Sequence, residues 1–201
     1  MKLLAPQIYT SYGFVKEDVL NGKKALDVGC GSRKLPGAIG LDIVPSPAVD
    51  FVHNIAQTPW PFNDNEFDVV FMNHSLEHVV DVLDTLSEVH RISKNGARIV
   101  IQVPHFRCLD AYVDPTHRHF FTSRSLDYFI EGENYTKYNY IPVRFKKLGF
   151  WYGWPHKSKN PLRQMIKNFT HRFPDFYDMY LSHLFPTECL TWELEVIKSK
   201  K

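Results

Sequence analysis

The chain has 201 residues, 44% of them hydrophobic and 14% aromatic, and its formal net charge at pH 7 is +2. This length predicts a single domain over residues 1–201 with a substantial core, and no apolar run approaches the roughly 18–20 residues that a membrane helix needs. The first residues lack the pattern of a signal peptide, and the three cysteines show no paired spacing. We therefore expect a cytoplasmic protein with reduced thiols and no transmembrane segment.

Five short apolar runs predict the strands of a sheet, and turn-forming or polar residues bound each run. They cover residues 24–30, 38–43, 49–55, 67–73 and 97–103. Runs of this length and β-branched content are typical of strands buried on both faces, and therefore of a parallel sheet.

A helix is predicted between the fourth and fifth of these strands. Apolar residues recur every three or four positions from Leu76 to Ile92, which indicates a helix over residues 75–93 with Asn73 or Ser75 as its N-cap. Strand, helix and strand in this order form a right-handed crossover unit. We therefore expect an α/β fold with a doubly wound, mostly parallel, open sheet.

The pattern loosens after the fifth predicted strand. We expect residues 104–121 to form a long functional loop, and residues 122–130 to begin a helix capped by Thr122 or Ser123. Residues 189–200 alternate as a strand does, which predicts a last strand that returns to the edge of the sheet. The domain would thus consist of a core over residues 20–133, an insertion over residues 134–188 and this strand.

The segment from residue 134 to residue 174 carries nine Lys or Arg residues, ten aromatic residues and no acid, whereas residues 1–133 are net acidic. A basic segment with interleaved aromatic side chains suits an anionic partner: a phosphorylated small molecule, a nucleic acid or a membrane surface. We expect this segment to form a lid or a substrate-binding insertion. The alternative is a solvated, lysine-rich face over a few core aromatics.

The stretch ALDVGCGSRKLPGAIGLDI, residues 25–43, indicates a ligand site. Gly29 and Gly31 follow the first predicted strand, where glycine allows a tight turn and a close approach of the backbone to a ligand. The dinucleotide pattern would need a third glycine at Lys34, and no G-K-[ST] follows, so both pyrophosphate-binding patterns fail. Asp42, at the end of the second strand, is an acid that can accept both hydroxyls of a ribose.

The first crossover is unusually short. Only SRKLPGA separates the glycine turn from the second strand, and Pro36 and Gly37 would break a helix there. Seven extended residues reach about 23–25 Å, enough to return along a strand of about 17–20 Å. We therefore expect a nearly bare loop or a single turn, which leaves one face of the first strands thinly covered. The N-terminal segment, or a partner chain in a homodimer, would cover that face.

From about residue 24 to residue 123 the chain resembles the class I S-adenosylmethionine-dependent methyltransferases of the small type-11 domain group. Four motifs carry the resemblance in order: LDVGCG, GLDI, PWPFNDNEFDVVFMNHSLEHV and LSEVHRISKNGARIVIQVPH. The family usually has K-P-G-G where this chain has Lys94-Asn95-Gly96-Ala97. The shortened crossover and the segment DPTHRHFF resemble a subgroup of the family without a settled substrate.

The resemblance implies S-adenosyl-L-methionine as the cofactor and a set of residues that bind it. Asp27 would orient the amino group of the methionine part over the glycine turn, Asp42 would hold the ribose, and Ile43 would pack on the adenine. Asn54 stands where the family usually has an acid, but its side-chain oxygen can still accept a hydrogen bond. The full implied set is Asp27, Gly29, Cys30, Gly31, Asp42, Ile43, Asn54, Ile55, Asn73 and His74. Taken singly, these residues also fit an ordinary turn, surface acids and a helix cap.

A polar group of side chains follows the fifth predicted strand, where open α/β sheets bind their ligands. Methyl transfer needs positioning, and it needs a base only where the acceptor carries a proton that must leave. The candidate catalytic residues are His105, His117 and Asp114, because a histidine titrates near neutrality. The candidate substrate-binding residues are Arg107, Arg118 and His119. The structural alternative is a turn at Asp114, with the histidines hydrogen-bonded within the loop.

A metal site is a further alternative for this loop. His105, Asp114, His117 and His119 offer ligand types that a metal ion accepts, and His-x-His in a strand points both rings to one side. The spacing matches no common zinc pattern, so we expect no metal there.

The leading hypothesis from the sequence is a methyltransferase that transfers a methyl group in line from S-adenosyl-L-methionine to an anionic small molecule or nucleic acid. A non-catalytic methyltransferase-like module that binds cofactor or partner is the alternative, supported by the short crossover and Asn54. A third hypothesis, an NAD-dependent oxidoreductase, is disfavoured by the missing third glycine.

Overall fold

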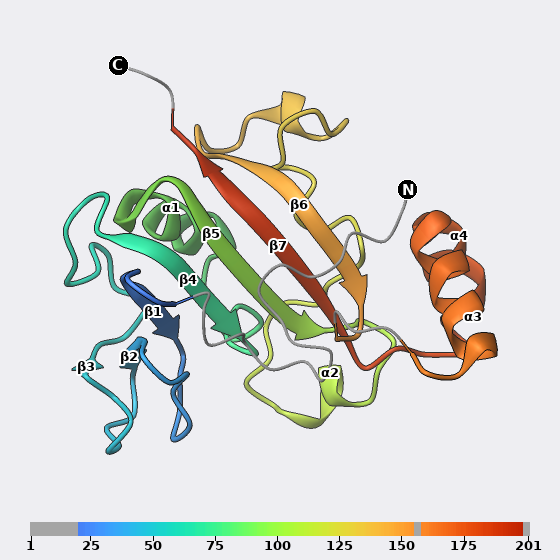
Figure 1. The fold of residues 1–201 in the computed structure, drawn as a ribbon, viewed down its shortest axis with the longest axis horizontal. Coiled ribbons are helices and arrows are strands. Elements are labelled where there is room, and N and C mark those ends of the chain that lie inside the picture. Colours follow the sequence, from blue (N-terminus) through green and yellow to red (C-terminus); the bar gives the residue numbers. More distant parts are fainter. Residues whose placement is uncertain (1–19, 155–157, 199–201) are drawn as a thin grey trace.

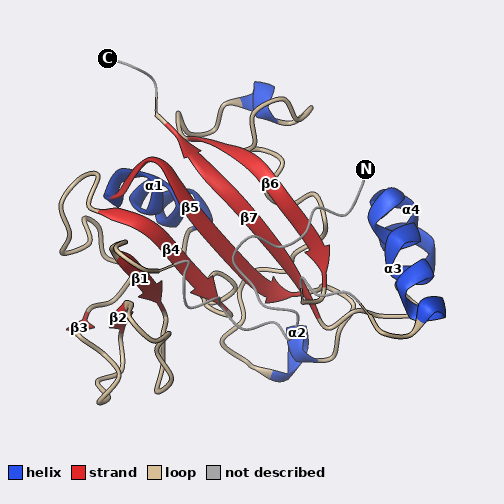
Figure 2. Ribbon diagram, viewed as in Figure 1, coloured by secondary structure: helices blue, strands red, loops and turns tan. Residues whose placement is uncertain are grey.

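Seven strands form one open sheet in the order β3-β2-β1-β4-β5-β7-β6 (Figures 1 and 2). The computed structural model describes residues 20–154 and 158–198. Strands β1 to β5 pair in parallel, and β7 pairs antiparallel with both β5 and β6. The predicted open, mostly parallel α/β sheet is thus confirmed. The strands are β1 (Ala25–Val28), β2 (Ile39–Asp42), β3 (Phe51–Val52), β4 (Phe67–Asn73), β5 (Ser93–Pro104), β6 (Arg144–Tyr152) and β7 (Cys189–Ile197).

The strand order reverses between β1 and β4. The chain adds β2 and β3 on one side of β1, and then β4 and β5 on the other side. Val28 at the end of β1 lies opposite Met72 near the end of β4. Ligands of open α/β sheets bind at such a point, beyond the carboxyl ends of the strands.

The first crossover is a bare loop, as predicted, because residues 29–38 contain turns and no helix. Leu35 of this crossover packs with Leu20 and Trp154 on the thinly covered face. They lie against a small buried cluster made of Ala25, Ala38, Val69, Phe71 and Val100. The crossover thus helps to cover its own strands. The N-terminal segment expected here lies, up to residue 19, outside the described residues.

The helix predicted from residue 75 begins only at Val82. Helix α1 (Val82–Ile92) is capped by Asp81, whose carboxylate accepts hydrogen bonds from the N–H groups of Leu83 and Asp84 at 2.6 and 3.0 Å. His74 has a φ of 52°, so the chain leaves β4 through a left-handed residue and forms turns before Asp81. The predicted caps, Asn73 and Ser75, are therefore wrong, because Asp81 satisfies the free amides of the helix.

The helix predicted over residues 122–130 is absent, and turns take its place. The side-chain oxygen of Ser125 accepts from the N–H of Thr122 at 2.9 Å, and Asp178 accepts from the N–H of Ser123 at 3.0 Å. These side chains take backbone donors at the start of the segment and favour turns over a helix. In the preceding loop, residues 110–113 form the short helix α2 (Asp110–Val113). The third predicted strand is reduced to the two exposed residues of β3.

The last strand, β7, lies between β5 and β6 and not at the edge, so the predicted edge position is wrong. The edge strand is β6, which is formed by nine residues of the segment expected as an insertion. After β6 come α3 (Pro161–Arg172), α4 (Pro174–Phe176) and the π-helix η3 (Tyr177–Leu181), while the 3-10 helix η2 (Thr136–Tyr138) precedes it. Figure 1 shows α3 and α4 beyond β6, away from β1 and β2.

The main core includes apolar residues of α1, of the sheet and of residues 121–145. Trp60, Trp192, Phe67 and Phe145 are among its largest fully buried side chains. Cys30, Cys108 and Cys189 are buried free thiols. Among the described residues, no helix is long and apolar enough to cross a membrane.

Candidate cofactor and acceptor site

The two glycines after β1 differ in what surrounds them. Gly29 has a φ of +70°, and a Cβ there would lie 2.5 Å from the Cβ of Ser75, so packing and backbone conformation both require glycine. Gly31 has a φ of +57°, and nothing lies within 4 Å of the position that its Cβ would take. The side of the loop at Gly29 therefore packs against Ser75, whereas the side at Gly31 is open, so that a ligand can approach the backbone there.

Asp42 ends β2 directly beside this loop. One of its carboxylate oxygens accepts from the N–H of Gly31 at 2.8 Å, and the other accepts from the N–H of Val44 at 2.9 Å. Next to it, the side chain of Ile43 is 59% exposed although it is apolar. An anchored carboxylate beside an exposed apolar side chain fits a nucleoside, because the acid can accept from ribose hydroxyls while the apolar side chain covers the base.

Asp27 lies under the same loop and is almost fully buried. Its carboxylate accepts from the N–H of Leu35 at 2.9 Å. Burial raises the pKa of Asp27 to about 6, against the opposing effect of this hydrogen bond. A cation that binds beside Asp27 would favour its charged form, as an amino group of a ligand does. Burial also raises the pKa of the neighbouring Cys30 thiol, to about 11, so this cysteine is a neutral side chain at pH 7.

The remaining predicted cofactor residues lie at the ends of β3 and β4. The side-chain oxygen of Asn54 accepts from the N–H of Ala56 at 3.0 Å, and the carbonyl of Ile55 accepts from the indole N–H of Trp60 at 3.0 Å. Asn73 and His74 are exposed at the end of β4. Because β1 pairs with both β2 and β4, the structure brings Asp27, the glycine turn, Asp42 and Asn73 to neighbouring strand ends.

His105 does not face this crevice. It is fully buried, its Nε2 lies 3.1 Å from a carboxylate oxygen of Asp178, and its Nδ1 accepts from the N–H of Arg107 at 3.3 Å. Asp178 also accepts from the N–H and hydroxyl of Ser123 and from the hydroxyl of Tyr152, at 3.0, 2.7 and 2.8 Å. Burial alone would raise the pKa of Asp178, but these hydrogen bonds hold it below its usual range. This geometry makes His105 a structural partner of Asp178.

The other polar residues of the loop are also engaged within the protein. Asp114 accepts from the N–H and hydroxyl of Thr116, at 2.8 and 2.7 Å, and so forms the turn that was the structural alternative. The Nδ1 of His117 donates to the carbonyl of Ala111 at 3.0 Å, and the Nε2 of His119 lies 2.9 Å from the carbonyl of Val79. The Arg118 side chain is exposed.

The four residues considered as metal ligands do not form one cluster. In the described part of the chain, one group of three close metal-ligating side chains is present: Glu77, His78 and His117. Only His117 belongs to both sets. No spacing rule in the sequence connects residues 77 and 78 with residue 117.

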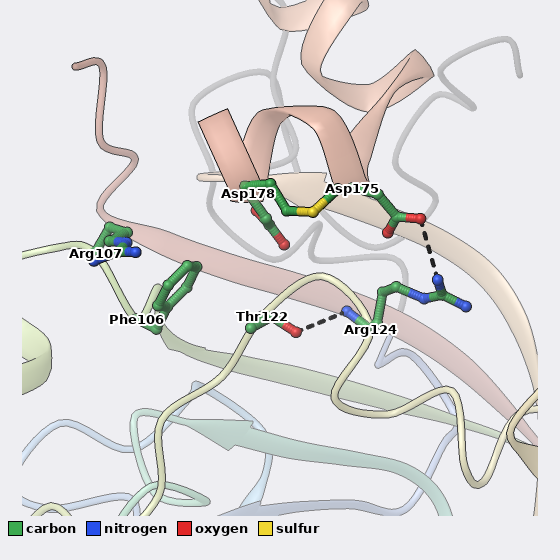
Figure 3. Close-up of a pocket in the computed structure, with 7 residues that line it drawn as sticks. Phe106, Arg107, Thr122, Arg124, Asp175 and Asp178 are labelled. Carbon is green, nitrogen blue, oxygen red and sulfur yellow. Dashed lines mark hydrogen bonds and ion pairs between the residues drawn. The ribbon is translucent and has the colours of Figure 1, made fainter. Parts of the chain in front are cut away.

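A pocket of about 530 Å³ lies beyond β5, between the loop after this strand and the helical segment near α4 (Figure 3). The guanidinium of Arg107 lies over the ring of Phe106, 4.7 Å from its centroid, whereas Arg124 pairs with Asp175 at 3.1 Å. Apart from Arg107, the sequence indicated none of these residues as part of a site. The lining consists of Phe106, Arg107, Thr122, Arg124, Asp175, Asp178 and Met179.

The geometry defines a class of protein: an open α/β sheet with a glycine turn and an anchored carboxylate at its switch point. A family model described as "Methyltransferase domain" matches residues 15–139. The chain belongs to this methyltransferase family, whose cofactor is S-adenosyl-L-methionine. The residues present fit this cofactor, because the loop is open at Gly31 and Asp42 stands beside it.

Curated relatives and solved structures agree with this assignment. A demethylmenaquinone methyltransferase of Lysinibacillus sphaericus is 32% identical, over 39% of this chain and 43% of its own length. A 2-phytyl-1,4-naphtoquinone methyltransferase of Nostoc punctiforme is 32% identical, over 40% of this chain and 46% of its own. The chain thus spans less than half the length of these relatives. A SAM-dependent methyltransferase from Archaeoglobus fulgidus shares the fold, with a TM-score of 0.53, 18% identity and 86% coverage of both chains.

Proposed function

We propose that this chain transfers a methyl group from S-adenosyl-L-methionine to a small anionic acceptor that binds in the pocket beyond β5. The observation that carries the proposal is the open cradle at Gly31 beside the anchored carboxylate of Asp42. The pocket with Arg107 begins two residues after the end of β5, at the same edge of the sheet. A cofactor site and an acceptor site would therefore lie beyond neighbouring strand ends.

The cofactor residues would act through placement. When bound, S-adenosyl-L-methionine supplies an electrophilic methyl group on a sulfonium centre. Asp27 would meet the amino group of the methionine part, Asp42 the ribose hydroxyls, and Ile43 the adenine. Asn54 would contribute to the adenine through its side-chain amide. Its oxygen already accepts from the N–H of Ala56, so one lone pair of that oxygen remains for a ligand. These contacts fix the direction in which the methyl group points, which is what an in-line transfer requires.

The acceptor residues would bind charge and exclude water. Arg107 has no acidic partner among the described residues, so its guanidinium is available for an anionic group. Phe106 and Met179 add apolar surface to the pocket. Asp175, Asp178 and Met179 come from the segment expected as a lid or insertion, which supports a substrate-binding role for residues 174–181.

The proposed methyl transfer does not depend on a dedicated base. His105 is fully buried and both of its ring nitrogens are engaged within the protein, so it is not free to take a proton from an acceptor in this structure. Asp114 is exposed and holds the turn at Thr116 through one carboxylate oxygen. His117 keeps its Nε2 without a hydrogen bond among the described residues. We therefore assign the main contribution to positioning and desolvation, which methyl transfer requires in every case.

The experiment first measures binding of S-adenosyl-L-methionine and S-adenosylhomocysteine by calorimetry, with the native protein and Asp42→Ala. Turnover is then assayed by release of S-adenosylhomocysteine with phenolic, sugar-phosphate, lipid and nucleic-acid acceptors. We expect micromolar binding of the cofactor by the native protein and its loss in Asp42→Ala. We also expect turnover with a small anionic acceptor, and Arg107→Ala should lower this turnover without changing the affinity for the cofactor. Absence of cofactor binding would contradict the whole proposal. Binding without turnover on any acceptor class would favour the non-catalytic module, and turnover restricted to nucleic acid would refute the small acceptor.

A further inference from the structure

We propose that Glu77, His78 and His117, with His74 beside them, bind a divalent transition-metal ion. One ligand atom of each of the first three residues lies within 4.8 Å of the others. The Nδ1 of His74 lies 3.3 Å from a carboxylate oxygen of Glu77. The cluster lies in the turns between β4 and α1 and in the loop that faces them, and it shares only His117 with the predicted set of ligands.

Glu77 is the observation that points to a ligand. Glu77 is fully buried, yet neither of its carboxylate oxygens accepts a hydrogen bond from any described residue. A buried carboxylate without hydrogen bonds is costly, because burial removes the water that would solvate its charge. A cation bound by Glu77 would compensate for that cost. The ring of His74 lies beside one oxygen of Glu77, Oε1, so it leaves Oε2 without a partner among the described residues.

The hydrogen bonds of His78 and His117 engage Nδ1 and leave Nε2 of each ring without a partner among the described residues. Thr116 donates its only hydroxyl proton to Asp114 at 2.7 Å, so its oxygen accepts from the Nδ1–H of His78 at 2.8 Å. The Nδ1 of His117 lies 3.0 Å from the carbonyl of Ala111, which can only accept. Both rings therefore carry their proton on Nδ1 and present the lone pair of Nε2, and second partners of this kind orient histidine ligands in metal sites.

Backbone hydrogen bonds hold the two halves of the cluster together. The carbonyl of Glu77 accepts from the N–H of Arg118 at 2.9 Å and from the N–H of His119 at 3.2 Å. The loop that carries His117 is thus fixed against the residue that carries the carboxylate. The rings of His78 and His117 lie with their centroids 4.6 Å apart and their planes at 69°.

The ligand chemistry indicates the class of metal. Two neutral imidazoles and one carboxylate suit Zn²⁺, Fe²⁺, Co²⁺ or Ni²⁺, whereas Mg²⁺ and Ca²⁺ prefer oxygen ligands alone. Three protein ligands, as in catalytic zinc sites, leave a coordination position for an external group.

The test uses metal alone, so that it does not depend on the proposed function. Protein without a histidine tag is treated with chelator, and binding of Zn²⁺ is measured by calorimetry and of Co²⁺ by visible absorption. We expect one ion per chain in the native protein, with the absorption bands of nitrogen and oxygen ligands. Glu77→Gln and His117→Ala should weaken binding at least tenfold, whereas His183→Ala, which removes an exposed histidine elsewhere, should not.

Thr116→Ala provides a milder variant, because Thr116 is exposed and is not a ligand, and its hydroxyl bonds the Nδ1 of His78 and the carboxylate of Asp114. Removing the hydroxyl that orients His78 should weaken metal binding about 10- to 100-fold, and Thr116→Ser should restore the affinity. Circular dichroism checks that each variant is folded. Absence of binding by the native protein, equal affinity in Glu77→Gln and His117→Ala, or thiolate bands in the Co²⁺ spectrum would overturn the proposal.

Discussion

Replacing Gly31 with alanine should weaken cofactor binding at least tenfold without unfolding the protein. Gly31 has a φ of +57°, and no atom lies within 4 Å of the position of an added Cβ. The methyl group would therefore meet no protein atom in the free chain. It would extend into the space where the methionine part of S-adenosyl-L-methionine is proposed to lie.

The expected loss of stability follows from the backbone alone. An L residue in the left-handed region costs about 1–2 kcal/mol, which for a chain of this size lowers Tm by roughly 2–8 °C. Gly96 offers a matched control, because it has a φ of +78° and its added Cβ would also meet nothing within 4 Å. Gly96 lies in β5 before the regular pairing of this strand with β4 begins at Arg98, at the opposite end of the strand from the carboxyl end.

Thermal denaturation and calorimetry with S-adenosylhomocysteine separate the two effects. Gly31→Ala and Gly96→Ala should lose similar stability, but only Gly31→Ala should lose at least tenfold in affinity, or about 1.4 kcal/mol of binding free energy. Equal affinity of the two variants would refute the placement of the cofactor over Gly31. A loss of affinity in both would show that stability, and not the cradle, limits binding.

Three other predictions follow from single side chains. Because the pKa of Asp27 is about 6 in the free protein and a cationic amino group would lower it, cofactor affinity should be roughly tenfold weaker at pH 5 than at pH 8. Calorimetry should show a flat profile over this range for Asp27→Asn. Asp178→Ala should lower the free energy of unfolding by about 3–5 kcal/mol in urea denaturation, because it leaves the buried hydroxyls of Ser123 and Tyr152 without their acceptor. Arg107→Ala should raise the KM for an anionic acceptor more than Arg107→Lys, with unchanged affinity for the cofactor.

The sheet and the cofactor loop could be predicted from local sequence because each depends on neighbouring residues. Short β-branched runs indicated the parallel strands, and glycines at positions 29 and 31 indicated the turn after β1. Pro36 and Gly37 excluded a helix in the crossover, and the structure confirms a loop there. The position of β7 could not be obtained in this way, because alternation indicates a strand but carries no information about its neighbours.

The candidate site was less predictable because it depends on long-range contacts. His105 looked available after β5, but its partner Asp178 lies 73 positions further along the chain. The same carboxylate binds Ser123 and so opposes the predicted helix at residue 122. Sequence spacing cannot show which polar side chains will pair across such a distance, and the engagement of His105 follows from a pair of this kind. The turn at Asp114 is local, with Thr116 two residues away as its partner, and the sequence offered it as an alternative.

The failed prediction of a helix start at residue 75 has a physical meaning for the site. Apolar periodicity continues through residues 76–80, yet the chain forms turns there before Asp81 caps α1. In these turns Ser75 packs against Gly29 of the cofactor loop, while the carbonyl of Glu77 holds the loop of His117. A helix from residue 75 would commit the carbonyl of Glu77 to a bond within the helix and would release that loop. Local preference thus gives way at the place where the glycine turn after β1 and the loop of His117 are fixed to the same short segment, as is expected of a functional site.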